Sequence, residues 1–335
     1  MRRMMILVGL GLMVAGLVFA NGEQEYPAQD ITTIVVWGAG GGTDTTNRVI
    51  MAEMARELGT RVNVTNVTGG SAGSVGMSAA FAEDADGYTL VGASESNSAT
   101  AVMVQDYDQL VDAWHWFIVG GSPDVVSVTP DLPYETIEDL IDAAAAAPGE
   151  IRAGAGGNGS IHHVNLLALE AGTGVDFNFI PYDGSAPSQN AAMTGEVQLV
   201  ITSVAEQAEL LRAGRLRPLA VLIPDAFSFD GSSIPSAFDP YPQLAEVLPI
   251  PQSIGFAVRA DAPDAVKQTL NGAFERAMQS QAVQDFGRER FYVLSGLYGS
   301  DALELMERLQ ANMSWALWDN ELATRNPGDL GIPRP

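Results

Sequence analysis

Short apolar runs alternate along the chain with glycine-rich turns and with stretches whose apolar residues recur at helical spacing. The apolar run 31–36 predicts a strand, the glycine-rich stretch 38–42 a tight turn, and 45–58 a helix. The same order of strand, glycine loop and helix recurs at 61–82 and again at 151–171. Because alternating strands and helices are typical of parallel sheets, we expect an α/β fold with parallel strands.

The rest of the chain continues this alternation with two exceptions. The polar stretch 94–98 is predicted to be a loop, and 224–251, rich in proline, serine and aspartate, a long surface loop. The strands are too many for one ordinary sheet and the composition changes at 120–123, so we expect two α/β lobes. The remaining expected elements are strands at 88–91, 125–128, 175–180, 197–201, 216–223 and 254–258 and helices at 136–147, 206–212, 264–278 and 301–322.

The first twenty residues have the pattern of a secretory signal. Arg2 and Arg3 precede an apolar run over 4–19, and the small residues around 18–20 offer a cleavage site after Ala20. An uncleaved membrane anchor is the alternative, but a run of roughly 17 residues that includes glycines is marginal for spanning a bilayer. We therefore expect a periplasmic or otherwise extracytoplasmic protein.

Charge and composition exclude several classes of function. Asp and Glu number 41 against 17 Lys and Arg, a formal charge of −24, and such a surface repels the phosphates of nucleic acid. The chain has no cysteine, which excludes disulfides, thiolate nucleophiles and iron–sulfur clusters. His162 and His163 are adjacent on a predicted helix, about 100° apart, so they cannot share one metal ion. We expect no nucleic acid partner, no metal and no cofactor.

Three glycine-rich loops precede predicted helices, which is where open α/β sheets bind ligands. The first loop begins at Trp37 and ends with Thr43 and Asp44. It lacks the lysine of a nucleotide P-loop, which argues against NTP binding. The third places His163 one turn beyond Ser160, next to a possible anion site.

The second and third loops each leave an enzyme open as an alternative. Residues 69–73 spell the G-x-S-x-G of a serine hydrolase around Ser71, although the strand before it is polar. Gly154, Gly156 and Gly159 spell the G-x-G-x-x-G of an NAD-dependent oxidoreductase, although export argues against that cofactor.

Several strings, in this order and spacing, resemble the tripartite tricarboxylate transporter receptors, the Bug-type solute-binding proteins. The likeness covers nearly all of the chain after the signal. The strings are 34–44, 86–90, 157–160 with His163, 181–184, 213–221 and the helix start at 262–263.

The resemblance implies a two-lobed periplasmic-binding-protein-like fold with a ligand cleft between two α/β domains. It implies a receptor, not an enzyme, that closes on a small organic acid and passes it to the integral-membrane permease subunits of a tripartite transporter. We expect a monomer with a signal peptide at 1–20, lobe one at 28–122 plus 252–335, and lobe two at 123–251.

In such receptors backbone N–H groups of glycine loops, rather than an arginine, hold the ligand's carboxylate. The family often carries Lys where this chain has Asp183, which favours a monocarboxylate, an amino acid or a cation-bearing acid over citrate. The candidate ligand-binding residues are Trp37, Gly40, Gly41, Thr43, Asp44, Ser94, Ser96, Gly159, Ser160, His163, Tyr182, Gly184, Ser185, Ala186, Thr202 and Ser203.

Overall fold

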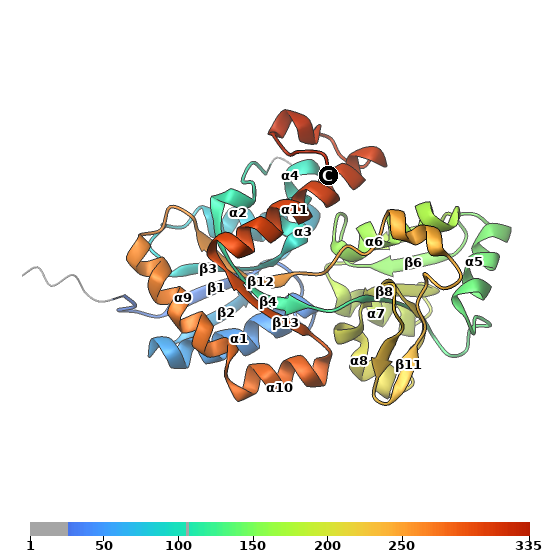
Figure 1. The fold of residues 1–335 in the computed structure, drawn as a ribbon, viewed down its shortest axis with the longest axis horizontal. Helices are drawn as coiled ribbons and strands as arrows, with labels where there is room; N and C mark the ends of the chain where they lie inside the picture. Colours follow the sequence, from blue (N-terminus) through green and yellow to red (C-terminus); the bar gives the residue numbers. More distant parts are fainter. Residues whose placement is uncertain (1–25, 105–106) are drawn as a thin grey trace, which may run out of the picture.

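Two α/β lobes lie side by side and are joined by segments that cross between them (Figure 1). The computed structural model describes residues 26–104 and 107–335, so the predicted signal at 1–20 lies outside the described residues. Lobe one is built on a six-stranded sheet and lobe two on a five-stranded sheet. The two-lobed α/β fold is confirmed, and the residue boundaries of the lobes stay a prediction.

The sheet of lobe one is mixed, with the order β13-β4-β12-β3-β1-β2. β1 runs parallel to β2 and β3, whereas β12 runs antiparallel to β3 and β4. The expectation of parallel sheets is wrong here because the chain leaves lobe one at the end of β4 and returns beside that end, where Ile254 pairs with Gly120. The strands are β1 (Ile31–Val35), β2 (Val62–Asn66), β3 (Thr89–Ser94), β4 (Trp114–Gly121), β12 (Ile254–Arg259) and β13 (Val293–Tyr298).

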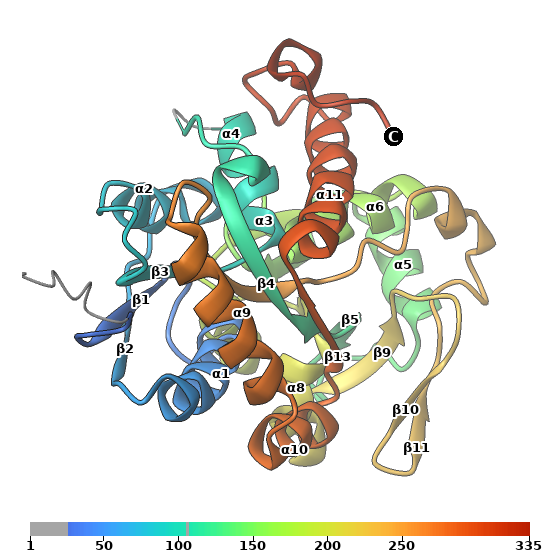
Figure 2. The same cartoon turned by 60° about the vertical axis from the view of Figure 1, so that its left-hand side comes forward.

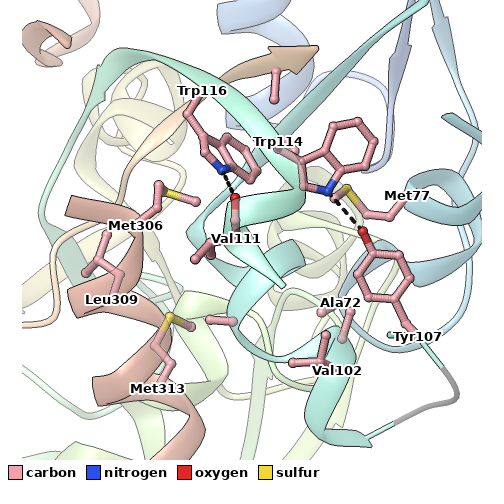
Figure 3. Close-up of a cluster of buried hydrophobic side chains, with 14 of the residues drawn as sticks. Ala72, Met77, Val102, Tyr107, Val111, Trp114, Trp116, Met306, Leu309 and Met313 are labelled. Carbon is pink, nitrogen blue, oxygen red and sulfur yellow. Dashed lines mark hydrogen bonds between the residues drawn. The ribbon is translucent and has the colours of Figure 1, made fainter. Parts of the chain in front are cut away.

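Helices cover both faces of this sheet, so its central strands bury side chains on both sides. On one face Phe117 of β4 stacks on Phe256 with ring centroids 4.5 Å apart. On the other face Trp116 packs in the cluster that contains Met306, and its indole donates a hydrogen bond of 2.8 Å to the Val111 carbonyl (Figure 3). The helices of lobe one are α1 (Gly42–Leu58), α2 (Ser74–Phe81), α3 (Glu95–Ala99), α4 (Ala101–Val104), α9 (Asp264–Met278), α10 (Gln281–Arg290) and α11 (Gly299–Asp319).

The sheet of lobe two has the order β7-β6-β8-β5-β9 and is also mixed. β6 runs parallel to β7 and β8, and β5 runs antiparallel to β8 and β9. Leu140 and Leu169 from two covering helices pack with Leu199 and Ile201 of β8 in one buried cluster. The elements are β5 (Asp124–Val128), α5 (Ile137–Ala146), β6 (Arg152–Ala155), α6 (Ile161–Thr173), β7 (Asn178–Pro181), α7 (Ser185–Met193), β8 (Leu199–Ser203), α8 (Val204–Arg212) and β9 (Arg217–Val221).

Both loop predictions need correction. The stretch 94–98 contains α3, because Ser94 and Asn97 form a capping box that begins a helix. The stretch 224–251 holds the hairpin of β10 (Phe227–Phe229) and β11 (Ser232–Ile234), which extends from lobe two in Figure 2, and a 3₁₀ turn. Its Leu244 and Leu248 are buried in the core of lobe two, so only part of this stretch is a surface loop.

Two segments connect the lobes and touch each other through their backbones. β4 ends at Gly121 and β5 begins at Asp124, while the return passes through Gln252 to β12. A Cβ on Gly121 would lie only 1.7 Å from the backbone oxygen of Gln252. The crossing therefore has no room for a side chain at Gly121.

Within the described ranges, no helix combines the length and apolarity needed to cross a bilayer.

Candidate functional site

A small cavity of about 30 Å³ lies between the lobes, at the ends of several strands and the starts of the helices that follow them. α1 and α3 reach it from lobe one, and α6, α7 and α8 reach it from lobe two. The lining residues are Trp37, Gly41, Gly42, Thr43, Ser94, Ser96, Gly156, Ser160, Ile161, His162, Gly184, Ser185, Glu206 and Gln252.

The lobes are closed around this cavity by hydrogen bonds that involve backbone groups. Gly38 N–H donates to the Asp183 carbonyl at 3.0 Å, and Ala72 N–H donates to the Asn158 carbonyl at 3.1 Å. Ser96 Oγ of lobe one accepts from the N–H of Ile161 at 2.8 Å. Because about 30 Å³ is room for roughly one water molecule, a larger ligand requires the lobes to separate.

The loop before α1 is held by Asp44, whose carboxylate points back into lobe one. Its Oδ2 accepts from Gly40 N–H at 2.9 Å, and Arg48 and Asn66 also donate to the carboxylate. Burial opposes ionisation of Asp44, but these hydrogen bonds outweigh it and lower its pKa. Asp44 therefore orders the turn that places Gly41 at the start of α1.

A buried ionic network forms the wall of the cavity on lobe two. His162 Nδ1 lies 2.8 Å from Asp124 Oδ1, and its Nε2 lies 3.1 Å from Glu206 Oε2. Burial alone would lower the pKa of His162, but the charges of Asp124 and Glu206 raise it well above its usual value. Burial likewise opposes ionisation of Glu206, yet the positive charge of His162 and hydrogen bonds from His162, Ser203 and Ser185 lower its pKa to about 2.

His163, in contrast, is turned away from the cavity. Its ring stacks on Phe179 with centroids 3.9 Å apart, and its Nδ1 accepts from Gly159 N–H at 3.1 Å. Burial lowers its pKa to about 4. Ser160 caps α6, since its Oγ accepts from His163 N–H at 3.2 Å. The adjacent histidines thus face different surroundings, as a 100° offset on a helix requires.

We predict opposite titrations for these two histidines. Folding raises the pKa of His162, so its contribution to stability is complete below 6.5 and is lost as pH rises through the folded value. Folding lowers the pKa of His163, so its contribution is complete above 6.5 and is lost as pH falls toward 4. NMR titration of the imidazole carbons, with His115→Gln and His163→Gln to assign the three histidines, should show the His162 ring cationic at neutral pH and the His163 ring titrating near 4. Titration of both near 6.5 would contradict the buried network.

The structure brings together only part of the residue set expected from the sequence. Those lining the cavity are Trp37, Gly41, Thr43, Ser94, Ser96, Ser160, Gly184 and Ser185. Those outside its lining are Gly40, Asp44, Gly159, His163, Tyr182, Ala186, Thr202 and Ser203. Asp183 contributes its backbone carbonyl to lobe closure, and its side chain is not part of the lining.

Six lining residues were not among the ligand-binding candidates chosen from the sequence, namely Gly42, Gly156, Ile161, His162, Glu206 and Gln252. The sequence contains a pattern that points to one of these residues, Glu206. Ser203 and Glu206 have the S-x-x-E spacing of a capping box, and the structure contains that box at the start of α8. The pattern gives the position of Glu206 on its helix but not its contact with the other lobe.

Neither enzyme motif is matched by a catalytic arrangement in the described part of the chain. Ser71 lies in a 3₁₀ turn, and the hydrogen bonds of the histidines go to other groups: His162 to Asp124, His163 to Gly159 and His115 to Asn271. The Gly159 carbonyl of the dinucleotide-like loop accepts from Thr100 Oγ1 of lobe one at 2.8 Å. No cluster of residues suited to a metal ion occurs among the described residues.

Comparison with known proteins gives consistent results. Residues 46–294 match the family described as tripartite tricarboxylate transporter family receptor. Protein BugT of Bordetella pertussis is 32% identical over 293 residues, which cover 84% of this chain and 86% of BugT.

Solved structures show the same fold. An R. palustris protein solved with adipate is 25% identical with a TM-score of 0.80, covering 89% of this chain and 99% of that one. MatC from Rhodopseudomonas palustris, solved with bound malate, is 18% identical with a TM-score of 0.79, covering 87% of this chain and 100% of that one.

Proposed function

Because the chain belongs to the family of tripartite tricarboxylate transporter receptors, we propose that it captures a small carboxylate between its lobes and delivers it to membrane permease subunits. The family is one of solute-binding receptors. The proposal places the protein outside the cytoplasm, after removal of the segment up to Ala20, as a monomer without catalytic activity. The malate and adipate of the two relatives in solved structures support a carboxylate ligand.

The observation that carries the proposal is the composition of the cavity wall. α1 and α7 begin there, from opposite lobes, at Gly42 and Ser185. The first N–H groups of a helix have no partner within the helix, and the helix dipole favours an anion beside them. Serine hydroxyls from both lobes, among them Ser96 and Ser160, add further polar atoms. A carboxylate bound by both lobes would hold them closed.

The strength of such binding follows from the number of donors. A charge-assisted hydrogen bond contributes roughly 1.5 to 3 kcal/mol. Four or five of them, after the costs of association, would give about −8 kcal/mol, which corresponds to a Kd of about 1 μM.

We predict that a small carboxylate will raise the melting temperature of the purified protein. At a concentration about 100 times Kd, binding adds about 2.7 kcal/mol to the free energy of unfolding. A thermal-shift screen of organic acids, amino acids, nicotinamide nucleotides and esters tests this. Stabilisation by NAD alone would favour the oxidoreductase, and ester hydrolysis abolished by Ser71→Ala would favour the hydrolase.

A further inference from the structure

Glu206 is fixed to lobe two by groups that belong to that lobe. Its Oε2 accepts from Ser203 N–H at 2.9 Å and from Ser203 Oγ at 2.8 Å, and lies 3.1 Å from His162 Nε2. The Glu206 side chain is only 5% exposed. Its position therefore does not depend on lobe one.

The other oxygen of Glu206 faces lobe one. Oε1 accepts from Gly42 N–H, at the start of α1, at 2.8 Å. A ligand larger than a water molecule requires the lobes to separate, and Ser203 and His162 then move together with Glu206. The bond to Gly42 is the one that breaks. The opened cleft consequently presents a carboxylate oxygen on lobe two opposite N–H donors on lobe one.

Among the described lining residues, the one side chain with a full positive charge is His162, and it is already paired. None of the residues lining the cavity in the described structure is lysine or arginine. His162 contacts the carboxyl groups of both Asp124 and Glu206, so its positive charge is already shared between two partners. With its pKa lowered to about 2, Glu206 is ionised at neutral pH.

We propose that Glu206 makes this site selective for acids that also carry a hydrogen-bond donor, with an ammonium group preferred: small aminocarboxylates rather than dicarboxylates. This inference rests on the proposed function. The ligand's carboxylate takes N–H groups at the helix starts, that of Gly42 among them, and its ammonium group donates to Glu206 Oε1 in place of Gly42. A second carboxylate at the same place would face Glu206 as a like charge in a poorly hydrated cleft, which is unfavourable.

Matched ligand pairs test the proposal in the unmodified protein. Each pair exchanges an ammonium group for a carboxylate: β-alanine with succinate, 4-aminobutanoate with glutarate, and alanine with methylmalonate. By isothermal titration calorimetry we expect the amino acid of any binding pair to bind at least tenfold more tightly than its partner. A dicarboxylate that binds as tightly or more tightly would overturn the inference and leave the carboxylate receptor intact.

Two substitutions on α8 assign the preference to one side chain. Glu206→Gln removes the charge in the cleft and should reduce the difference within a pair to less than about threefold. Glu209→Gln removes the same charge from an exposed position of the same helix, where Glu209 pairs with Arg212, and should leave the preference unchanged. Equal effects of the two would overturn the role of Glu206. If neither the pairs nor any organic acid of the screen binds, the receptor function fails together with the inference.

Discussion

Replacement of Gly41 by valine is expected to weaken ligand binding at least 100-fold and to lower the melting temperature by only a few degrees. Gly41 has φ −75° and ψ 174°, an extended conformation that valine adopts readily. A Cβ there would lie 3.4 Å from the Gly38 carbonyl oxygen and 3.8 Å from the backbone nitrogen of Ser185 on the other lobe. The Cβ is tolerated, but the valine methyl groups would occupy the space between the two helix starts.

Two further variants provide a comparison for the effect of Gly41→Val on affinity and stability. Gly184→Val should lose stability as well as affinity, since Gly184 has φ +135°, which side-chain-bearing residues rarely adopt. Ser160→Ala should change affinity less than about fivefold, because it removes a helix cap worth about 1 kcal/mol. Calorimetric titration beside thermal melting separates binding from stability. A folded Gly41→Val protein with unchanged affinity would show that the ligand does not bind at this cavity.

Replacement of Gly121 by alanine should lower the free energy of unfolding by about 3 kcal/mol, the upper end of ordinary overpacking. The added Cβ would lie 1.7 Å from the Gln252 oxygen and 2.6 Å from its carbonyl carbon. Both atoms are backbone, so the two crossing segments themselves must move apart. The effect is steric, because the φ of Gly121 is not in the left-handed region.

Gly272→Ala is the matched control for that substitution. Gly272 lies inside α9, where the nearest atom to a Cβ is the end of the flexible Arg276 side chain at 3.3 Å. Alanine in a helix interior should stabilise by up to about 1 kcal/mol. Chemical denaturation of both variants gives the comparison. If Gly121→Ala were as stable as the unmodified protein, the crossing segments would have to be more loosely packed than described.

The two-lobed architecture could be predicted because most strands are short, apolar and bounded by glycine. Apart from the hairpin of β10 and β11, two strands, β4 and β13, were not predicted, for different reasons. β4 sends Trp116 and Phe117 to opposite cores, so its apolar run lacks the alternation that marks a half-buried strand. β13 lies at the edge of its sheet with Val293 71% exposed, and its mixed pattern does not stand out from a loop.

The candidate site could be predicted only in part, because glycine loops indicate helix starts but not which side chains meet there. His162 and His163 are neighbours in sequence, and only the fold decides that His162 lines the cavity while His163 stacks on Phe179. Glu206 contacts Gly42 across 164 positions of sequence. No local pattern encodes a contact of that range.

The small volume between the closed lobes also has a kinetic consequence. A solute cannot pass into a space of about 30 Å³, so its capture waits for the lobes to part. Once the lobes have closed on the solute, its departure likewise waits for them to part. The dwell time of the solute is thus governed by the protein's own opening rate, not only by the contacts that the solute makes. For the function proposed above, such closure would retain the solute over the time needed to diffuse to a permease, even when few bonds hold the solute itself.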